Sequence, residues 1–175
     1  MGKSSKENVQ EDTKKILNEL RSNANESLNN IAEKLNFSRQ KIWRIIKNLE
    51  KEKKIWGYTT VVDDIAFGYN QYFILLKRSN VPSSEKLLKI ISSREVKNRL
   101  DEIDINIVGS FYVHGDYDWV IIVTARDIKQ VKRTVELFFN ELEEYISNVK
   151  ILEVLFPLEK CGIENPNSEK IKDFF

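Results

Sequence analysis

The side chains best suited to chemistry in this sequence are the cations and amides between residues 38 and 54. This stretch holds seven basic and two acidic residues. On a helical wheel of 100° per residue, the long polar side chains gather on one side. Such side chains bind phosphate oxygens and base edges in the major groove of double-stranded DNA. The residues expected to contact DNA are Ser38, Arg39, Gln40, Arg44, Lys47 and Lys51.

Catalytic and metal-binding chemistry has few candidates. The chain contains a single Cys, Cys161, and a single His, His114. One Cys cannot form a disulfide within the chain, and one of each cannot form a zinc site built from Cys and His. We therefore expect a free thiol in a reducing compartment, no metal, no cofactor and no enzyme activity.

The basic segment is predicted to be the last of three helices. Ser38 is a good N-cap for it, Ser27 caps a shorter helix that ends before Asn36, and Asp12 is the expected cap of a first helix over residues 12–21. Three helices with a short break before the last are typical of a helix-turn-helix. The apolar side of the third helix repeats at i, i+3, i+4 and i+7 and consists of Ile42, Ile45, Ile46 and Leu49.

The segment Ile55–Val62 is β-branched and aromatic, which predicts a strand or wing followed by a linker that ends near Asp63 and Asp64. Trp43 lies at the border of the polar and apolar sides and is expected to pack at the domain edge. A solvated Lys-rich helix without a partner is the alternative. The capped helix before the basic segment and the strand after it favour DNA binding.

The second half predicts the element order βαββαβ, which is the ferredoxin-like arrangement. One helix follows Pro82-Ser83-Ser84, with Leu87, Leu88, Ile91 and Leu100 on its apolar side. The other follows Asp127, with Gln130 in a capping box and with Ile128, Val131, Val135, Phe138, Phe139 and Leu142 on its apolar side. The expected strands are Tyr72–Lys77, Ile107–Val113, Tyr117–Thr124 and Lys150–Leu158.

The fold class is therefore α+β, with a winged helix-turn-helix domain over residues 1–63 and a ferredoxin-like domain over 64–160. A polar tail follows over 161–175, which we expect to be loosely ordered or docked on another surface. The net charge is +1, with 13 basic and 8 acidic residues up to Thr60 and 15 basic and 19 acidic residues after it. No stretch has the roughly 18 to 20 apolar residues of a membrane span, so we expect a cytoplasmic protein without a membrane partner.

Three expected strands are apolar at positions that point to both faces of a sheet: Tyr72–Leu76, Trp119–Val123 and Ile151–Phe156. Two helices can cover only one of these faces. A second copy of the sheet across a two-fold axis would cover the other, which predicts a homodimer. The alternative is that the first domain folds back over this face.

Five segments in this order resemble the Lrp/AsnC (feast/famine) family of prokaryotic transcription regulators, over about residues 12–158. They are Lys15–Leu20, Ile31–Ser38, Asn48–Glu50, Ile55–Tyr58 and Gly115–Asp118. The resemblance implies a winged helix-turn-helix, dimerisation through the second domain, assembly of dimers and an amino-acid effector. The family usually has Arg at the position of Ile45 and Gly at that of Lys53, and its segment corresponding to residues 72–115 is shorter.

The resemblance also implies that an effector is held at the dimer interface by the loop of His114, Gly115, Asp116, Tyr117 and Asp118. The residues alone equally allow a simple hairpin turn, in which Gly and Asp satisfy the turn. Two alternative functions share the architecture. One is an enzyme that resembles the sirohaem decarboxylases, whose hairpin is rich in Tyr and Asn, and the other is an architectural DNA binder that senses no ligand.

Overall fold

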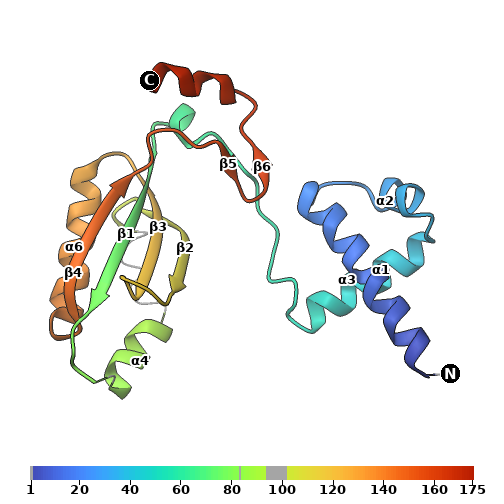
Figure 1. Ribbon diagram of the computed structural model, residues 1–175, viewed down its shortest axis with the longest axis horizontal. Coiled ribbons are helices and arrows are strands. Elements are labelled where there is room, and N and C mark those ends of the chain that lie inside the picture. The colour runs from blue at the N-terminus through green and yellow to red at the C-terminus, as the bar shows by residue number, and fades with distance from the viewer. Residues whose placement is uncertain (1, 83, 94–101) are drawn as a thin grey trace. The chain divides into compact units, whose positions relative to one another are not determined.

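The computed structural model describes residues 2–82, 84–93 and 102–175, which form two compact units (Figure 1). The first unit combines Met1–Val61 with Pro157–Phe175, and the second is Val62–Phe156. The segment after Pro157 thus belongs with the first unit. In the described ranges, no helix combines the length and the apolar character that crossing a membrane requires.

The first unit is built on three helices, α1 (Gly2–Ser22), α2 (Leu28–Leu35) and α3 (Arg39–Lys51). One face of each helix supplies a common apolar core, so the expected helix-turn-helix is confirmed. Leu17, Leu20 and Ile55 pack around this core as partly buried residues. The core consists of Ile16, Ile31, Ile42, Ile45, Ile46 and Leu49.

Serine hydroxyls cap α2 and α3 as the sequence predicts. Ser27 Oγ accepts a hydrogen bond from the N–H of Asn30 at 3.1 Å, and Ser38 Oγ accepts one from the N–H of Lys41 at 3.2 Å. Each bond satisfies an amide that has no partner within its own helix. The starts of α2 and α3 are therefore fixed by local sequence.

The prediction that Asp12 caps the first helix is wrong, because α1 begins at Gly2 and Asp12 lies inside it. An aspartate there cannot cap amides that the helix already bonds. Its carboxylate instead lies 2.7 Å from Lys41 Nζ, and Lys41 also lies over the Phe37 ring at 3.7 Å. Lys41 therefore ties α3 to α1 and does not belong to the free cations of α3.

The strand expected over Ile55–Val62 does not form. Residues 56–63 have no regular secondary structure and pair with no strand in the described part of the chain. β-branched and aromatic residues favour a strand only where a partner supplies hydrogen bonds. Near the end of the chain, β5 (Glu159–Lys160) and β6 (Ile163–Glu164) form a two-stranded hairpin, and the 3₁₀ helix η3 (Ser168–Phe174) follows. The expected tail over 161–175 thus contains β6 and η3.

The second unit has the order β1 (Asn70–Arg78), α4 (Glu85–Ser92), β2 (Asn106–Tyr112), β3 (Trp119–Ala125), α6 (Ile128–Leu142) and β4 (Ile146–Glu153). The 3₁₀ helix η1 (Asp64–Phe67) precedes it, and η2 (Glu143–Tyr145) precedes β4. The strands form one antiparallel sheet in the order β2-β3-β1-β4. The ferredoxin-like fold is confirmed.

The last strand lies earlier than expected, at residues 146–153 rather than 150–158. Its pairing with β1 ends where Glu153 lies opposite Tyr72, two residues after β1 begins at Asn70. The third strand likewise begins at Trp119 rather than Tyr117. Where a strand ends depends on how it pairs with its neighbours, and the sequence of one strand does not contain this information.

The helices α4 and α6 begin where the sequence predicts, directly after Ser84 and at the expected cap Asp127. Ser84 Oγ accepts from the N–H of Leu87 at 3.2 Å, and Asp127 Oδ1 accepts from the N–H of Gln130 at 2.9 Å. Leu88 is 60% exposed and does not join the apolar side of α4. Three residues named for these apolar sides lie outside what the structure describes, either entirely or in their side chains: Ile91, Leu100 and Phe139.

The helices α4 and α6 cover one face of the sheet. Leu87 of α4 and Phe138 of α6 share a core with alternate residues of β1 and β3, and the Phe138 ring packs edge-on against Trp119 with centroids 6.0 Å apart. The buried strand residues on this face are Tyr72, Ile74, Leu76, Ile121, Val123 and Ala125.

The opposite face is also apolar, as expected from the doubly apolar strands. Phe73 lies opposite Ile122 on one side and Leu152 on the other, and Leu75 lies opposite Val120. Residues directly opposite each other share a face of the sheet. We call this the open face, which consists of Phe73, Leu75, Phe111, Val120, Ile122 and Leu152.

The end of α3 carries a lysine where glycine would be favoured. The N–H of Lys53 bonds to Glu50 O at 3.0 Å and that of Lys54 to Leu49 O at 2.9 Å, which is the Schellman pattern, and Lys53 has φ +56°. The end of α2 has the same pattern with Asn36 at φ +52°, and Asn tolerates this conformation. Lys53 therefore costs stability that the family's usual Gly would not.

We expect Lys53→Gly to raise the free energy of unfolding of the first unit by about 1 kcal/mol, because glycine adopts the left-handed conformation without steric cost. Urea unfolding followed by circular dichroism measures this. Lys54→Gly is the control, since Lys54 has no positive φ. Equal or lower stability of Lys53→Gly would contradict the assignment.

Candidate nucleic-acid interface

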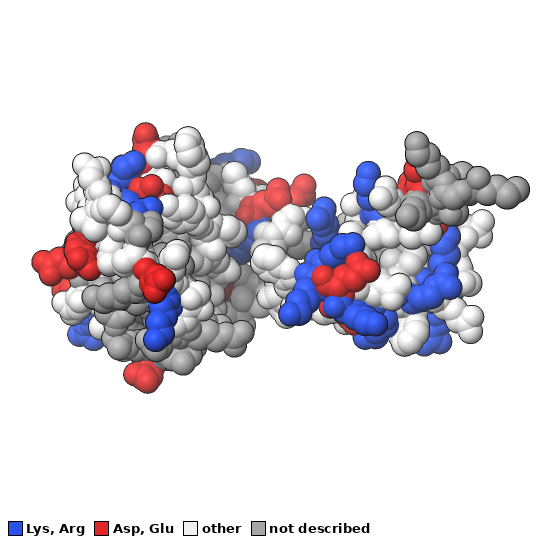
Figure 2. Space-filling model, turned by 90° about the horizontal axis from the view of Figure 1, so that it is seen from below, with Lys and Arg blue, Asp and Glu red and all other residues white. Residues whose placement is uncertain are grey.

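The solvent side of α3 carries polar side chains, most of which form no contact within the described structure. Burial of the aliphatic side of α3 turns positions 40, 44, 47 and 51 outward, and all four are exposed. In the described part of the chain, the side chains of Arg39, Gln40, Arg44 and Lys51 form no hydrogen bond or ion pair. Figure 2 shows Lys and Arg side chains gathered over the helical unit. These donors are free to bind phosphates and base edges.

Lys47 differs from its neighbours because an internal acid engages it. Its Nζ lies 2.7 Å from Glu50 Oε2, and Tyr58 Oη donates to Glu50 Oε1 at 3.0 Å. The bond from Lys47, then that from Tyr58, lowers the pKa of Glu50, while partial burial and the Glu50 bond raise the pKa of Tyr58. Glu50 thus stays ionised and fixes the segment after α3 to the flank of the helix.

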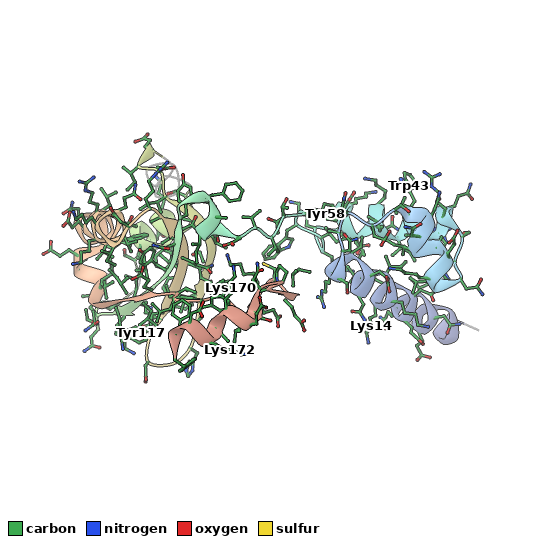
Figure 3. All side chains as sticks on the ribbon, turned by 90° about the horizontal axis from the view of Figure 1, so that it is seen from above. Lys14, Trp43, Tyr58, Tyr117, Lys170 and Lys172 are labelled. Atoms are coloured by element: carbon green, nitrogen blue, oxygen red, sulfur yellow. The ribbon has the colours of Figure 1, made fainter. Side chains whose placement is uncertain are left out.

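Sequence reasoning missed Tyr58 because its partner, Glu50, is eight residues away and belongs to another element. It also misplaced Trp43. Trp43 is 54% exposed and belongs to neither apolar core, so the expected packing at the domain edge does not occur. Figure 3 labels Trp43 and Tyr58 on the helical unit.

The structure explains why α3 has Ile45 where the family that the sequence resembles usually has Arg. Ile45 is 9% exposed and packs in the core of the helical unit. An arginine with the same orientation would need to extend past the core to reach solvent. Arg44, one residue earlier, is exposed and turned 100° away. The cation available to DNA on this turn of α3 is therefore Arg44.

The second expected site, the loop of residues 114–118, joins β2 to β3. Asp118 supports the end of β1, since its Oδ2 accepts from the N–H of Arg78 at 2.8 Å and lies 3.9 Å from Lys77 Nζ. The carbonyl of Gly115 accepts a long bond from Lys77 Nζ at 3.5 Å. His114 and Asp116 are exposed, and Tyr117 is half-buried. Asp118 therefore serves the hairpin, whereas His114 and Asp116 face solvent.

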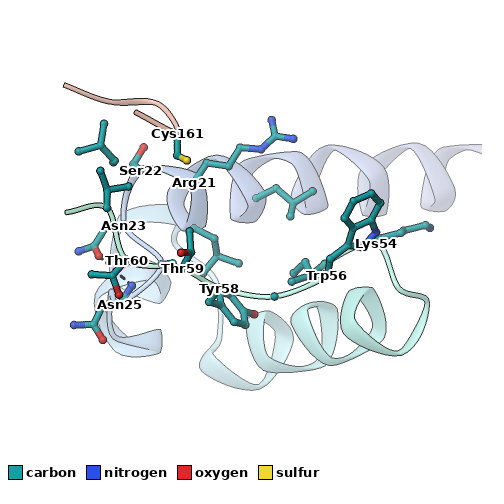
Figure 4. Close-up of a pocket in the computed structure, with 17 residues that line it drawn as sticks. Arg21, Ser22, Asn23, Asn25, Lys54, Trp56, Tyr58, Thr59, Thr60 and Cys161 are labelled. Carbon is teal, nitrogen blue, oxygen red and sulfur yellow. Dashed lines mark hydrogen bonds between the residues drawn. The ribbon is translucent and has the colours of Figure 1, made fainter. Parts of the chain in front are cut away.

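The first unit also contains a groove of about 900 Å³, shown in Figure 4. It lies between the end of α1 and the irregular segment after α3, with the tail residues Cys161 and Ile163 at one side. Polar lining comes from Arg21, Asn23 and Thr59 among others. The groove is separate from the exposed side of α3.

The comparisons with known proteins agree with this geometry. Residues 13–55 match a family model described as winged helix-turn-helix DNA-binding. No curated protein matches the chain. An AsnC family transcriptional regulator from Agrobacterium tumefaciens is similar in structure, with a TM-score of 0.64 and 19% identity over 85% of this chain and 91% of that one. The chain has the Lrp/AsnC fold.

Two further solved structures have this fold. LrpC of B. subtilis has a TM-score of 0.57 and 17% identity, over 84% of this chain and 94% of that one. The regulator NMB0573 of Neisseria meningitidis, solved as a complex with L-Met, has a TM-score of 0.65 and 15% identity, over 87% of this chain and 94% of that one. The resemblance in sequence to Lrp/AsnC regulators is thus confirmed at the level of the whole fold.

We expect Asp118→Ala to lower the free energy of unfolding by about 1 to 3 kcal/mol, because the N–H of Arg78 loses a charged acceptor. Asp118→Asn keeps an oxygen at this position and should lose less. Asp116→Ala, at an exposed position of the same loop, should stay within about 0.5 kcal/mol of the wild type. Urea unfolding measures all three. Equal stability of the Asp116 and Asp118 variants would refute the supporting role of Asp118.

Proposed function

We propose that this protein is a sequence-specific, DNA-binding transcription regulator of the Lrp/AsnC type. The observation that carries the proposal is the unused polar side of α3. A capped helix at the second position of a helix-turn-helix that presents free Arg, Gln and Lys side chains suits the major groove. The match of residues 13–55 to a winged helix-turn-helix DNA-binding family supports it. Such a regulator acts in the cytoplasm, where prokaryotic DNA lies.

Within this proposal the polar side chains of α3 have different roles. Gln40 and Arg44 occupy the middle of the exposed side and would read base edges, since both offer the paired hydrogen bonds that distinguish bases. Arg39 and Ser38 at the start of the helix, and Lys51 at its end, would contact phosphates. Lys47 would contact DNA by exchanging its ion pair with Glu50 for a phosphate, at little cost for an exposed pair.

A homodimer would bring two copies of α3 to adjacent half-sites. The open face supports this assembly, because an apolar sheet surface in contact with water is unfavourable and a two-fold copy of the same face is complementary to it. Dimers could assemble further, as the resemblance implies. The alternative, in which the first unit covers this face, has less support because DNA binding requires α3 to remain accessible.

An amino acid is the proposed effector class, supported by the structural neighbour solved as a complex with L-Met. The loop of residues 114–118 would contact it through His114, Asp116 and Tyr117 and through the backbone around Gly115, while Asp118 holds the loop in place. An enzyme of the sirohaem decarboxylase type has less support, since that chemistry has no use for a free basic face on α3.

Selection of bound fragments from random DNA, with and without pooled amino acids, tests the proposal. We expect one preferred palindromic site. On that site, Arg44→Ala or Gln40→Ala should cost about 1 to 3 kcal/mol and flatten the sequence preference, because each change removes hydrogen bonds to a base. Failure to enrich any sequence would refute the proposed function.

Lys51→Ala serves as the matched comparison within α3. It should weaken binding to the preferred and to a scrambled duplex equally, and the slope of log affinity against log salt should fall by about 1.8 for two phosphate contacts in a dimer. Titrations at several salt concentrations measure both quantities. If Arg44→Ala also weakens the two duplexes equally, α3 does not read bases as proposed.

The predicted dimer can be tested at Leu152, which lies on the open face and is 42% exposed. Leu152→Asp leaves the monomer core intact but places two carboxylates in the dimer interface, so it should give a monomer with lost DNA affinity. Leu88→Asp on α4 is the control and should remain dimeric. The fragment of residues 62–156 should be dimeric alone. Analytical ultracentrifugation decides, and a monodisperse monomer for the wild type would contradict the prediction.

A further inference from the structure

Trp43 is an exposed aromatic residue on the proposed DNA-reading helix, and no contact in the described structure explains it. It is 54% exposed, and it takes part in no ring contact, cation–π contact or hydrogen bond in the described part of the chain. Tryptophan is a poor choice for a solvated helix position, because its large apolar ring gains nothing from water and its helix propensity is modest. A partner for the indole is therefore expected.

The position of Trp43 identifies the surface that this partner must approach. Trp43 lies three residues after Gln40 and four before Lys47, so these three side chains are neighbours along one ridge of α3. All three are exposed. A DNA duplex that receives Gln40 and Arg44 in its major groove would meet the Trp43 ring on the same approach. A protein partner on Trp43 would block the cations beside it.

The chemistry of the major groove limits what an indole can bind there. Bases in a duplex are stacked, so the ring cannot intercalate without unstacking them and meets only their edges. These edges carry hydrogen-bonding groups, apart from one apolar group, the C5-methyl of thymine. We propose that Trp43 reads thymine, by packing its indole ring against a thymine methyl group in each half-site. This rests on the proposed function, because it requires α3 to lie in the major groove.

The test replaces thymine by deoxyuridine, which lacks only the methyl group. In the duplex obtained by selection, each thymine is replaced in turn, in symmetric pairs, and the affinity of the full-length protein is measured. At one pair of positions the wild type should bind about fourfold more weakly per half-site, or roughly fifteenfold in all, the factor for losing one buried methyl contact. Trp43→Ala should bind thymine and deoxyuridine duplexes equally at that pair.

Three variants separate this contact from other effects. Trp43→Phe keeps an apolar ring and should retain part of the thymine preference. Trp56→Ala removes a tryptophan that is 95% exposed and lies outside α3, so it should keep the full preference. Arg44→Ala should lose affinity but remain sensitive to deoxyuridine. Circular dichroism confirms that each variant is folded, as substitutions at exposed positions allow.

Each remaining outcome overturns the inference. If Trp43→Ala weakens preferred and scrambled duplexes by the same factor, the indole contacts the DNA backbone. If it changes the sedimentation coefficient and leaves the thymine preference intact, the indole contacts another copy of the protein. If a preferred site exists but no deoxyuridine replacement weakens binding, only this inference fails. If selection yields no preferred site, the proposed function fails and the inference fails with it.

Discussion

Burial of one side of α3 is the interaction on which the proposed function depends. Its four core side chains are worth about 1.5 to 3 kcal/mol each, so rotating the helix about its axis would cost far more than any exposed cation could gain by turning inward. The apolar core therefore fixes which residues meet solvent. Gln40 and Arg44 therefore need no contacts of their own to point outward, because packing of the opposite side of α3 sets their direction.

The sheet of the second unit obeys a related constraint with a different outcome. The order β2-β3-β1-β4 places both covering helices on the same face, because each βαβ crossover packs back on the sheet with one hand. The strands nevertheless carry apolar residues on both sides. The helix α3 has one apolar side, and the core of its own unit buries it. The sheet has two apolar faces, and α4 and α6 cover only one of them. The open face is thus the part of the second unit that most needs a partner.

The connections between elements hold local geometry that the cores do not set. Glu50 joins the segment after α3 to the helix through Tyr58, and Asp118 joins the hairpin loop to the end of β1. Lys53 shows that a helix end can keep its Schellman bonds without glycine, at a steric cost. These side chains act over distances that secondary-structure periodicity does not describe, and they determine where the loops of both units lie.

The sequence by itself determined the helices, their serine caps, the βαββαβ order and the exposed side of α3, because periodicity and capping depend on residues within a few positions of one another. Only the tertiary structure decided what depends on distant partners. Residues 55–62 form no strand because no described strand pairs with them, and the pairing of β4 with β1 ends at Glu153, opposite Tyr72. Asp12 pairs with Lys41 and caps no helix, because α1 begins before it. Trp43 is exposed because neither apolar core extends to its side of α3.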